Sequence, residues 1–166
     1  MTPSERARRI KMVIMDVDGV LTDGGMYYGE SGEELKKFNT RDGQGIALLH
    51  QAGIKTALMT GEQTEIVTRR ARKLSIEEVH QGLRNKLPAV EELIAKCNFV
   101  LEEVCYIGDD ILDLPLFGKV GLAVAVADAM PELKERADYI TRREGGQGAV
   151  REVCELILAA KDRLEN

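Results

Sequence analysis

The apolar run MVIM at residues 12–15 constrains the fold more than any other segment of this 166-residue chain. The run is short and shows no alternation of apolar and polar residues, which is typical of a strand buried on both faces in the middle of a parallel sheet. Asp16 and Asp18 follow at once, and Gly19 lets the backbone turn sharply after them. Because ligands bind at the carboxyl ends of strands in open α/β sheets, this acidic turn is a candidate functional site.

The acidic turn does not match a calcium loop of the EF-hand type. Counted from Asp16, such a loop requires Gly at its sixth position and Glu at its twelfth, where this chain has Leu21 and Tyr27. A plain Asp-x-Asp-Gly turn is an equal alternative for these residues alone, because Asp and Gly are common in turns. The rest of the chain has to distinguish a turn from a site.

Strand-like and helix-like segments alternate along the chain. Further strands are predicted at residues 54–59, 78–80, 104–107, 121–127 and 139–141. Helices are predicted at residues 46–51, 64–74, 87–96, 131–136 and 149–164, with a short turn near 113–117. This alternation implies right-handed crossovers and a mainly parallel sheet covered by helices on both faces. We therefore expect a doubly wound, Rossmann-like α/β fold that forms one domain over residues 1–166.

The segment at residues 24–38 has two short extended arms around a Ser-Gly turn, which indicates a β-hairpin projecting from the sheet. The polar stretch at residues 39–45 is expected to be a loop before the next helix. Between Asp23 and Thr60, and again between Gly61 and Lys86, there is room only for the hairpin and single helices. We therefore expect no separate cap domain over the strand ends.

Composition excludes several classes of partner. The chain is 44% hydrophobic with a net charge of -5, which argues against nucleic acid or an anionic membrane as the main partner, because both attract basic surfaces. The opening is charged and no apolar run approaches the ~18 residues of a membrane helix, so we expect a cytoplasmic protein. Cys97, Cys105 and Cys154 are odd in number and widely spaced, which predicts reduced thiols rather than disulfides or a zinc site.

Further polar features fall where strands end or helices begin: Thr60-Gly61, Lys86, and the acids Asp109, Asp110 and Asp113. Each one alone is more often a turn, a solvated lysine or a helix cap. Together they are what phosphoryl chemistry requires, because parallel strands end at one edge of the sheet. The carboxylates of Asp16, Asp18 and Asp109 are hard oxygen ligands for Mg²⁺. Thr60 and Lys86 can hold phosphate oxygens.

These residues match, in order, the four motifs of the haloacid dehalogenase (HAD) superfamily of phosphatases. More closely, residues 13–158 resemble the branch that acts on sugar acid phosphates, represented by the 3-deoxy-D-manno-octulosonate 8-phosphate (KDO 8-phosphate) phosphatases and their relatives for nine-carbon acids. The resemblance includes DVDGVLTDG at residues 16–24, FNTRDG at 38–43, QG at 81–82, AVADA at 125–129 and GGQGAVRE at 145–152. It implies a phosphomonoesterase with Mg²⁺ as its cofactor and a small sugar acid phosphate as its substrate.

By this resemblance, Asp16 is the nucleophile that forms an aspartyl-phosphate. Asp18 protonates the leaving sugar oxygen and then activates water, and Thr60 and Lys86 complete the catalytic set. The carboxylates of Asp16 and Asp109 and the backbone carbonyl of Asp18 hold Mg²⁺.

The resemblance also assigns residues around this set. Asp110 and Asp113 orient Lys86 or metal-bound water, and Arg41 and Asp42 line the mouth of the site. Substrate contacts are expected from Asn39, Arg41, Asp42, Gly43, Gly61, Glu62, Arg70 and Lys73. Family members assemble tetramers through their hairpins, so we expect a homotetramer in which a neighbouring subunit completes the site.

Two departures from the family pattern concern the choice of substrate. The pattern has Arg at two positions where this chain has Glu62 and Ala47, although Arg70 matches and could pair with a substrate carboxylate from an adjacent subunit. With Glu62 and Lys73 at these positions, the chain resembles the phosphatases of 2-keto-3-deoxy-nonulosonate (KDN) 9-phosphate, and Lys73 would offset the charge of Glu62. A surface Glu–Lys pair that contributes little is an equal alternative. The leading expectation is KDO 8-phosphate, for lipopolysaccharide sugar synthesis, and KDN or N-acylneuraminate 9-phosphate is the alternative.

Two interpretations from other classes are open. A phosphorelay receiver domain shares the acids, the Thr, the Lys and the doubly wound sheet, but it carries a phosphorylated Asp after its third strand. Here that strand is followed by Gln81-Gly82. A non-catalytic interaction module is expected to have lost an acid or the Lys, and none is lost.

Overall fold

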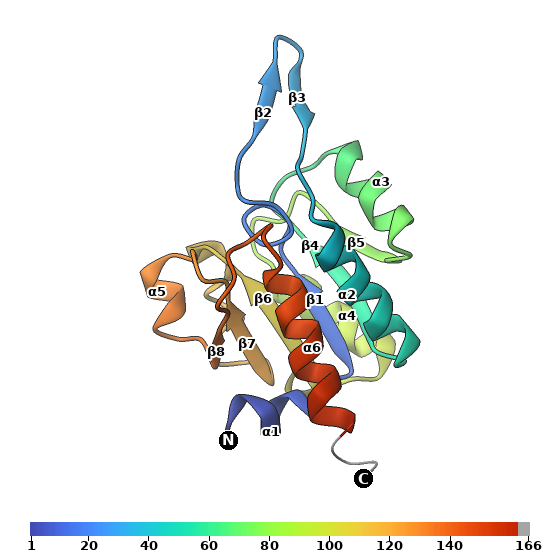
Figure 1. The fold of residues 1–166 in the computed structure, drawn as a ribbon, viewed down its shortest axis with the longest axis vertical. Helices are drawn as coiled ribbons and strands as arrows, with labels where there is room; N and C mark the ends of the chain where they lie inside the picture. The colour runs from blue at the N-terminus through green and yellow to red at the C-terminus, as the bar shows by residue number, and fades with distance from the viewer. Residues whose placement is uncertain (163–166) are drawn as a thin grey trace.

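A computed structural model describes residues 1–162 and shows six parallel strands in the order β5-β4-β1-β6-β7-β8 (Figure 1). The strands are β1 (Met12–Met15), β4 (Lys55–Met59), β5 (Glu78–His80), β6 (Val104–Gly108), β7 (Leu122–Ala125) and β8 (Tyr139–Ile140). The central strand β1 is buried along its whole length between β4 and β6. The predicted doubly wound fold is confirmed.

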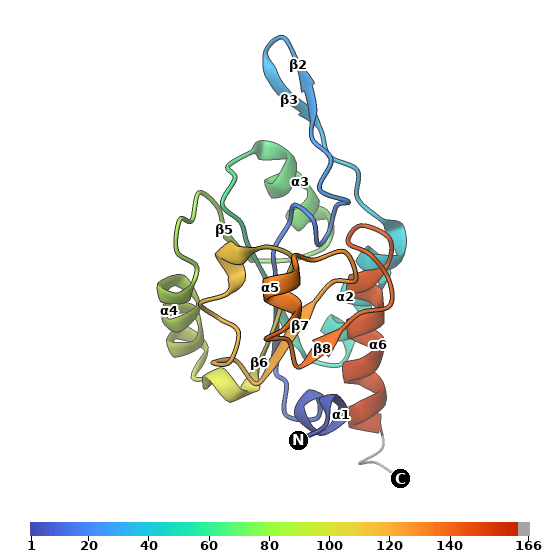
Figure 2. The ribbon, with the colours of Figure 1, turned by 90° about the vertical axis from the view of Figure 1, so that its left-hand side faces the viewer.

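Helices cover both faces of the sheet. Figure 2 shows α2 (Thr40–Gln51) and α6 (Ala149–Asp162) on one face and α4 (Leu87–Cys97) on the other. The remaining helices are α1 (Pro3–Ala7), α3 (Glu65–Lys73), α5 (Pro131–Lys134) and the short 3₁₀ turns η1 (Leu101–Glu103) and η2 (Ile111–Asp113). The sequence did not indicate α1 or η1, and the expected end of the last helix at residue 164 lies outside the described residues.

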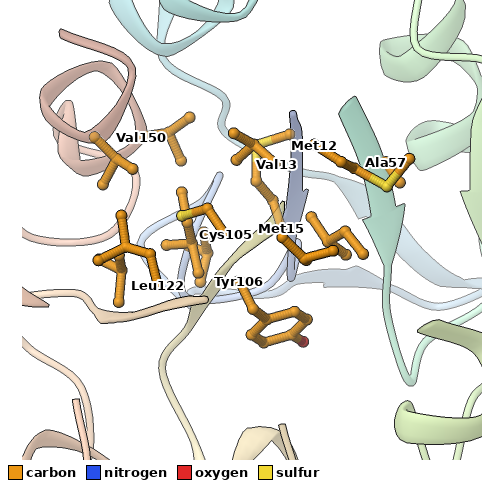
Figure 3. Close-up of a cluster of buried hydrophobic side chains, with 14 of the residues drawn as sticks. Met12, Val13, Met15, Ala57, Cys105, Tyr106, Leu122 and Val150 are labelled. Atoms are coloured by element: carbon orange, nitrogen blue, oxygen red, sulfur yellow. The ribbon is translucent and has the colours of Figure 1, made fainter. Parts of the chain in front are cut away.

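The hydrophobic core lies between the sheet and its helices. Figure 3 shows Met12, Val13 and Met15 of β1 beside Cys105 of β6, with Val150 of α6 at the left of the view. Two of the three cysteines, Cys105 and Cys154, belong to this core, and all three are free thiols. Across residues 1–162, no helix has both the length and the apolar character needed to cross a membrane.

The predicted hairpin is present and projects well beyond the sheet (Figures 1 and 2). Its antiparallel strands are β2 (Tyr27–Gly29) and β3 (Gly32–Leu35). Tyr28 and Leu35 are 65% and 62% exposed, so the hairpin presents apolar side chains to its surroundings. Between this hairpin and β4 the chain forms only α2, as the sequence predicted.

The predicted loop at residues 39–45 is wrong, because α2 begins at Thr40. The side chain of Asn39 caps the helix by accepting a hydrogen bond from the Arg41 backbone N–H at 2.8 Å. Gly45 weakens helix propensity, but its missing side chain lets α2 approach α6, where an added Cβ would lie 3.1 Å from the sulfur of Cys154. The cap and this close packing outweigh the low propensity of the glycines.

Asp42, expected at the mouth of the site, lies in the interface between α2 and α6 instead. It is only 1% exposed, and its Oδ1 accepts a hydrogen bond from the Arg151 backbone N–H, in the first turn of α6, at 2.9 Å. Burial raises the pKa of the Asp42 carboxyl, although hydrogen bonds from backbone N–H groups act in the opposite direction. Asp42 is therefore absent from the cavity of its own chain, and its position indicates a structural role.

We expect Asp42→Ala to lower the free energy of unfolding by about 1–3 kcal/mol, because it leaves a buried N–H without its acceptor. Urea unfolding curves of the variant and the parent measure the change. Asp162→Ala, at the exposed end of α6, is the control and should shift stability by about 0.5 kcal/mol or less. Equal effects of the two substitutions would contradict the structural role of Asp42.

Candidate active site at the carboxyl edge of the sheet

The sequence-predicted acids, threonine and lysine converge at one edge of the sheet. Asp16 follows β1, Thr60 follows β4, Asp109 follows β6, and Lys86 is the residue before α4. They line a cavity of about 310 Å³. The full lining is Asp16, Asp18, Gly24, Thr60, Gly61, Glu62, Lys86, Asp109, Asp110 and Leu112. Parallel strands that end together therefore bring all four motifs to one place.

A second cavity, of about 280 Å³, lies at the opposite edge of the sheet. It is lined in part by His50, Lys55, Glu77 and Cys97, near the amino ends of β4 and β5. The group of acids whose oxygens converge closely enough to hold a metal ion is at the carboxyl edge instead. We therefore assign the chemistry to the carboxyl edge.

Lys86 lies at the centre of the site. Its side chain is 2% exposed, and its Nζ lies 2.7 Å from Asp16 Oδ2 and 2.7 Å from Asp113 Oδ1. Burial opposes the charge of Lys86, but the two carboxylates raise its pKa above the ordinary value. Asp113 thus orients Lys86, as the family resemblance implied.

Tyr106 also belongs to this arrangement, although the sequence did not point to it. Its hydroxyl donates a hydrogen bond to Asp113 Oδ1 at 2.6 Å from within the buried strand β6. Asp113 accepts a further bond from the Asp109 backbone N–H at 3.1 Å, which fixes the turn that carries Asp109. The one available signal was a phenol in an otherwise apolar strand, since a buried hydroxyl requires a partner.

Three carboxylates crowd together at the strand ends. One oxygen from each of Asp16, Asp109 and Asp113 lies within 4.8 Å of the others. Burial and the neighbouring acids raise the pKa of Asp109 to about 8, and burial, opposed by Lys86, raises the pKa of Asp16 to about 6. Because Asp113 already binds Lys86 and Tyr106, the carboxylates best placed for a divalent cation are those of Asp16 and Asp109.

Gly19 allows the acidic turn to approach Asp109 this closely. Its φ angle is +82°, and a Cβ at this position would collide with the Asp109 carboxylate. The substitution of any other residue would therefore push the two acidic motifs apart.

Asp18 lines the same cavity but its carboxylate is outside the three-acid cluster. Its Oδ1 accepts a hydrogen bond from Lys36 Nζ at 2.6 Å, a contact that the sequence did not indicate. Although burial lowers the pKa of Lys36, hydrogen bonds to Asp18 and Glu33 raise it above the ordinary value. Lys36 is therefore a charged component of the site.

Thr60 and its neighbours form the opposite wall. Thr60 is 1% exposed, and its hydroxyl accepts a hydrogen bond from the Glu62 backbone N–H at 3.2 Å. Gly61 and Glu62 face the cavity. Asp110 is at the rim, where its side chain caps the Ile111 N–H at 2.6 Å rather than contacting Lys86. Of the two acids expected to orient Lys86 or metal-bound water, Asp113 is the one that contacts Lys86.

The other predicted substrate residues lie away from the cavity. Asn39 caps α2 and donates from Nδ2 to the Gly146 carbonyl at 3.2 Å. Arg70 donates to the Asn39 carbonyl at 3.2 Å and its guanidinium lies 5.2 Å from the centre of the Phe38 ring. Gly43 packs against Arg70, and Arg41 is exposed. Within one chain, these residues support the start of α2 rather than the cavity.

The expected pairing of Lys73 with Glu62 is wrong within one chain. Glu62 precedes the first residue of α3 and Lys73 is its last, so the nine-residue helix separates them by about 13 Å at 1.5 Å per residue. Among the ion pairs of the described residues, none joins the two side chains. Lys73 does not offset the charge of Glu62 in the same subunit.

We expect Mg²⁺ to stabilise the protein more at about pH 8 than at about pH 5.5. The raised pKa values of Asp16 and Asp109 mean that folding takes up protons between the ordinary value of 3.8 and about 8, so the stability of the metal-free protein falls as pH rises through this window. A bound cation offsets the repulsion between the ionised carboxylates, so its effect grows over the same window. The difference in Tm between samples in Mg²⁺ and in EDTA, taken at both pH values, measures this stabilisation.

Asp109→Asn is the control for this prediction, because it removes one proposed ligand and one titrating group. We expect the variant to lose most of the Mg²⁺-dependent shift in Tm at the higher pH. A shift that is equal at both pH values in the parent protein, or unchanged in the variant, would show that the cation binds elsewhere.

Comparison with known proteins identifies the family of this site. A family model described as haloacid dehalogenase-like hydrolase matches residues 72–153. The 3-deoxy-D-manno-octulosonate 8-phosphate phosphatase KdsC of Yersinia pestis is 51% identical over 161 residues, which cover 97% of this chain and 86% of that protein. The crystal structure of the Yersinia pestis phosphatase matches with a TM-score of 0.94 at 50% identity, over 98% of this chain and 88% of that chain.

A more distant relative was crystallised with ligands. The 3-deoxy-D-manno-octulosonate 8-phosphate phosphatase of Moraxella catarrhalis, in complex with a magnesium ion, a phosphate ion and KDO, is 41% identical with a TM-score of 0.94, over 98% of this chain and 94% of that chain. The match to these phosphatases covers most of both chains, so it gives no support to the receiver-domain and non-catalytic interpretations. The chain belongs to the haloacid dehalogenase-like hydrolase family and is a phosphatase of that family.

Proposed function

We propose that this phosphatase uses Mg²⁺ to hydrolyse the phosphate monoester of a 2-keto-3-deoxy sugar acid, with KDO 8-phosphate as the first candidate. The observation that carries the proposal is the pairing of Asp16 with Lys86 at 2.7 Å, beside Asp109, in a cavity at the carboxyl edge of the sheet. The relative that was crystallised with magnesium, phosphate and KDO supports the cation and the sugar acid. Release of KDO would serve lipopolysaccharide sugar synthesis.

The first step forms a covalent bond to the protein. An oxygen of the ionised Asp16 carboxylate attacks phosphorus, the bond between phosphorus and the sugar oxygen breaks, and Asp18 gives its proton to that oxygen. Lys86 orients Asp16 and, with the Thr60 hydroxyl, faces the negative charge of the phosphoryl oxygens. The sugar acid then leaves with this oxygen as a neutral hydroxyl.

The second step restores the protein. The ionised Asp18 removes a proton from water, whose oxygen attacks phosphorus, and the bond between phosphorus and Asp16 breaks. Inorganic phosphate leaves, Asp16 is again a carboxylate, and Asp18 is again protonated. Mg²⁺, held by Asp16, Asp109 and the Asp18 backbone carbonyl, would neutralise phosphoryl charge throughout. Two easier displacements replace one difficult one.

Asp16→Asn is expected to lower turnover of p-nitrophenyl phosphate by roughly 10⁴-fold or more, because the amide cannot act as the nucleophile. Its circular dichroism and Tm should remain close to those of the parent, since the amide nearly preserves the shape of the side chain. Asp23→Asn, in the same acidic stretch but exposed and paired with Lys37, is the control that should retain activity. Parent-like turnover by Asp16→Asn would refute the covalent route.

The choice between eight-carbon and nine-carbon acids depends on Glu62 in this proposal. Its side chain is exposed and lines the cavity, so it can accept hydrogen bonds from sugar hydroxyls. Neither Arg70 nor Lys73 reaches the cavity of its own subunit, so either would have to act on a neighbouring one. KDN or N-acylneuraminate 9-phosphate is the alternative substrate, because the family pattern for KDO 8-phosphate has Arg at position 62.

We expect Glu62→Arg to change the ratio of kcat/KM for KDO 8-phosphate to that for KDN 9-phosphate by about 10-fold, in favour of the eight-carbon acid. Purified parent and variant assayed with both phosphates measure the ratio. Glu65→Arg, an exposed change in the first turn of α3, is the matched control and should leave the ratio unchanged. An eight-carbon preference that Glu62→Arg leaves unaltered would show that Glu62 does not select the substrate.

The assembly that we propose is a homotetramer in which a neighbouring subunit covers the cavity. The hairpin exposes four apolar side chains, those of Met26, Tyr27, Tyr28 and Leu35. A cluster of exposed apolar side chains is typical of a surface that contacts another subunit. Phosphoryl transfer benefits from exclusion of water, and the chain between Asp23 and Thr60 provides no lid of its own. Sedimentation that shows a fully active monomer would contradict this assembly.

A further inference from the structure

Lys36 joins the hairpin to the acidic turn through an ion pair in which the lysine side chain is buried and that of Asp18 is partly exposed. It is the residue after β3, at the base of the hairpin, and its side chain is 0% exposed. Its Nζ lies 2.6 Å from Asp18 Oδ1 and 2.8 Å from Glu33 Oε1. An ammonium buried this completely needs a charged partner, so the position of Lys36 and that of the Asp18 carboxylate are set together.

The two oxygens of Asp18 are not equivalent. Oδ1 accepts the hydrogen bond from Lys36, whereas Oδ2 is buried and has no hydrogen-bond partner among residues 1–162. A carboxylate held at one oxygen has its other oxygen fixed in direction as well. The hydrogen bond from Lys36 therefore fixes the orientation in which the Asp18 carboxyl borders the cavity.

A neighbouring contact provides an internal comparison. Lys37 Nζ lies 2.9 Å from Asp23 Oδ2, so the same two segments of chain are joined twice. The Lys37 side chain is 55% exposed and the Asp23 side chain 31%, and exposed pairs of this kind contribute little. The two lysines thus differ in burial and in whether they touch the acid that lines the cavity.

We propose that Lys36 is a positioning residue, which holds Asp18 by Oδ1 in the orientation from which its carboxyl exchanges the proton with the leaving sugar oxygen. This inference rests on the role of Asp18 in the proposed function. It also gives the hairpin a part in the chemistry, because Glu33 of β3 holds the same ammonium. A displaced hairpin base would release Asp18 from its orientation.

The leaving group distinguishes this role from a merely structural one. A sugar alkoxide must be protonated as it leaves, whereas p-nitrophenolate leaves as a stable anion and needs no proton. The value of kcat/KM reports the steps up to departure of the leaving group. Loss of Asp18 positioning therefore lowers kcat/KM for the sugar phosphate and spares it for p-nitrophenyl phosphate, while general damage to the site lowers both.

The experiment compares kcat/KM for KDO 8-phosphate and p-nitrophenyl phosphate in the parent, Lys36→Met, Lys36→Arg and Lys37→Met. We expect Lys36→Met to lose about 100-fold with the sugar phosphate and about 3-fold or less with the aryl phosphate. Lys36→Arg keeps a cation beside Asp18 and should recover part of the sugar phosphate rate. Lys37→Met should match the parent on both substrates.

Equal losses on the two substrates, or the same pattern in Lys37→Met, would overturn the proposal. If Lys36→Met does not fold, Lys36→Gln, whose side chain is neutral and one atom shorter than that of lysine, replaces it with the same selective loss expected. A parent protein that turns over neither phosphate would instead refute the proposed function. The two failures are therefore distinguishable.

Discussion

The buried ammonium of Lys86 is the interaction on which the rest of the site depends. Three acids bring their oxygens within 4.8 Å of one another, and Lys86 is bonded to two of them, Asp16 and Asp113. Without this cation the strand ends would carry uncompensated like charges at low dielectric, which is costly. With all three acids ionised, two negative charges remain after Lys86 is counted, which is the charge that a divalent cation offsets. The same arrangement thus stabilises the fold and prepares the site for metal and phosphate.

The parallel sheet makes this concentration of charge possible. Strands β1, β4 and β6 are neighbours and end at the same edge, so acids far apart in the sequence meet without long loops. The close approach of the loops at this edge depends on glycine at a few positions. Gly19 lies against Asp109, and Gly146 lies against the acidic turn, where its N–H donates to the Val20 carbonyl at 2.9 Å. A larger residue at Gly146 would collide with the backbone of that turn.

The sequence predicted the parts of the molecule that local pattern determines. Short apolar runs and the glycines and polar residues that end them were enough to predict three features: the buried strand at residues 12–15, the hairpin and the motif residues at the strand ends. The contacts that the sequence missed join residues in different elements, 18 positions apart for Lys36 and Asp18 and seven for Tyr106 and Asp113. Lys36 meets Asp18 and Tyr106 meets Asp113 because the fold brings them together, and neither side chain stands out in its own segment. The start of α2 was predicted as a loop for a related reason, since a helix start with two glycines resembles a loop until α6 packs against it.

In the proposed reaction, Asp16 attacks phosphorus and carries the phosphoryl group before water does. The most direct test is the stereochemical course at phosphorus, followed with a sugar phosphate made chiral by oxygen isotopes and sulfur. Two successive in-line displacements, first by Asp16 and then by water, each invert the configuration, so the account predicts overall retention. Overall inversion would mean that water attacks the substrate directly, and it would contradict an aspartyl-phosphate on Asp16.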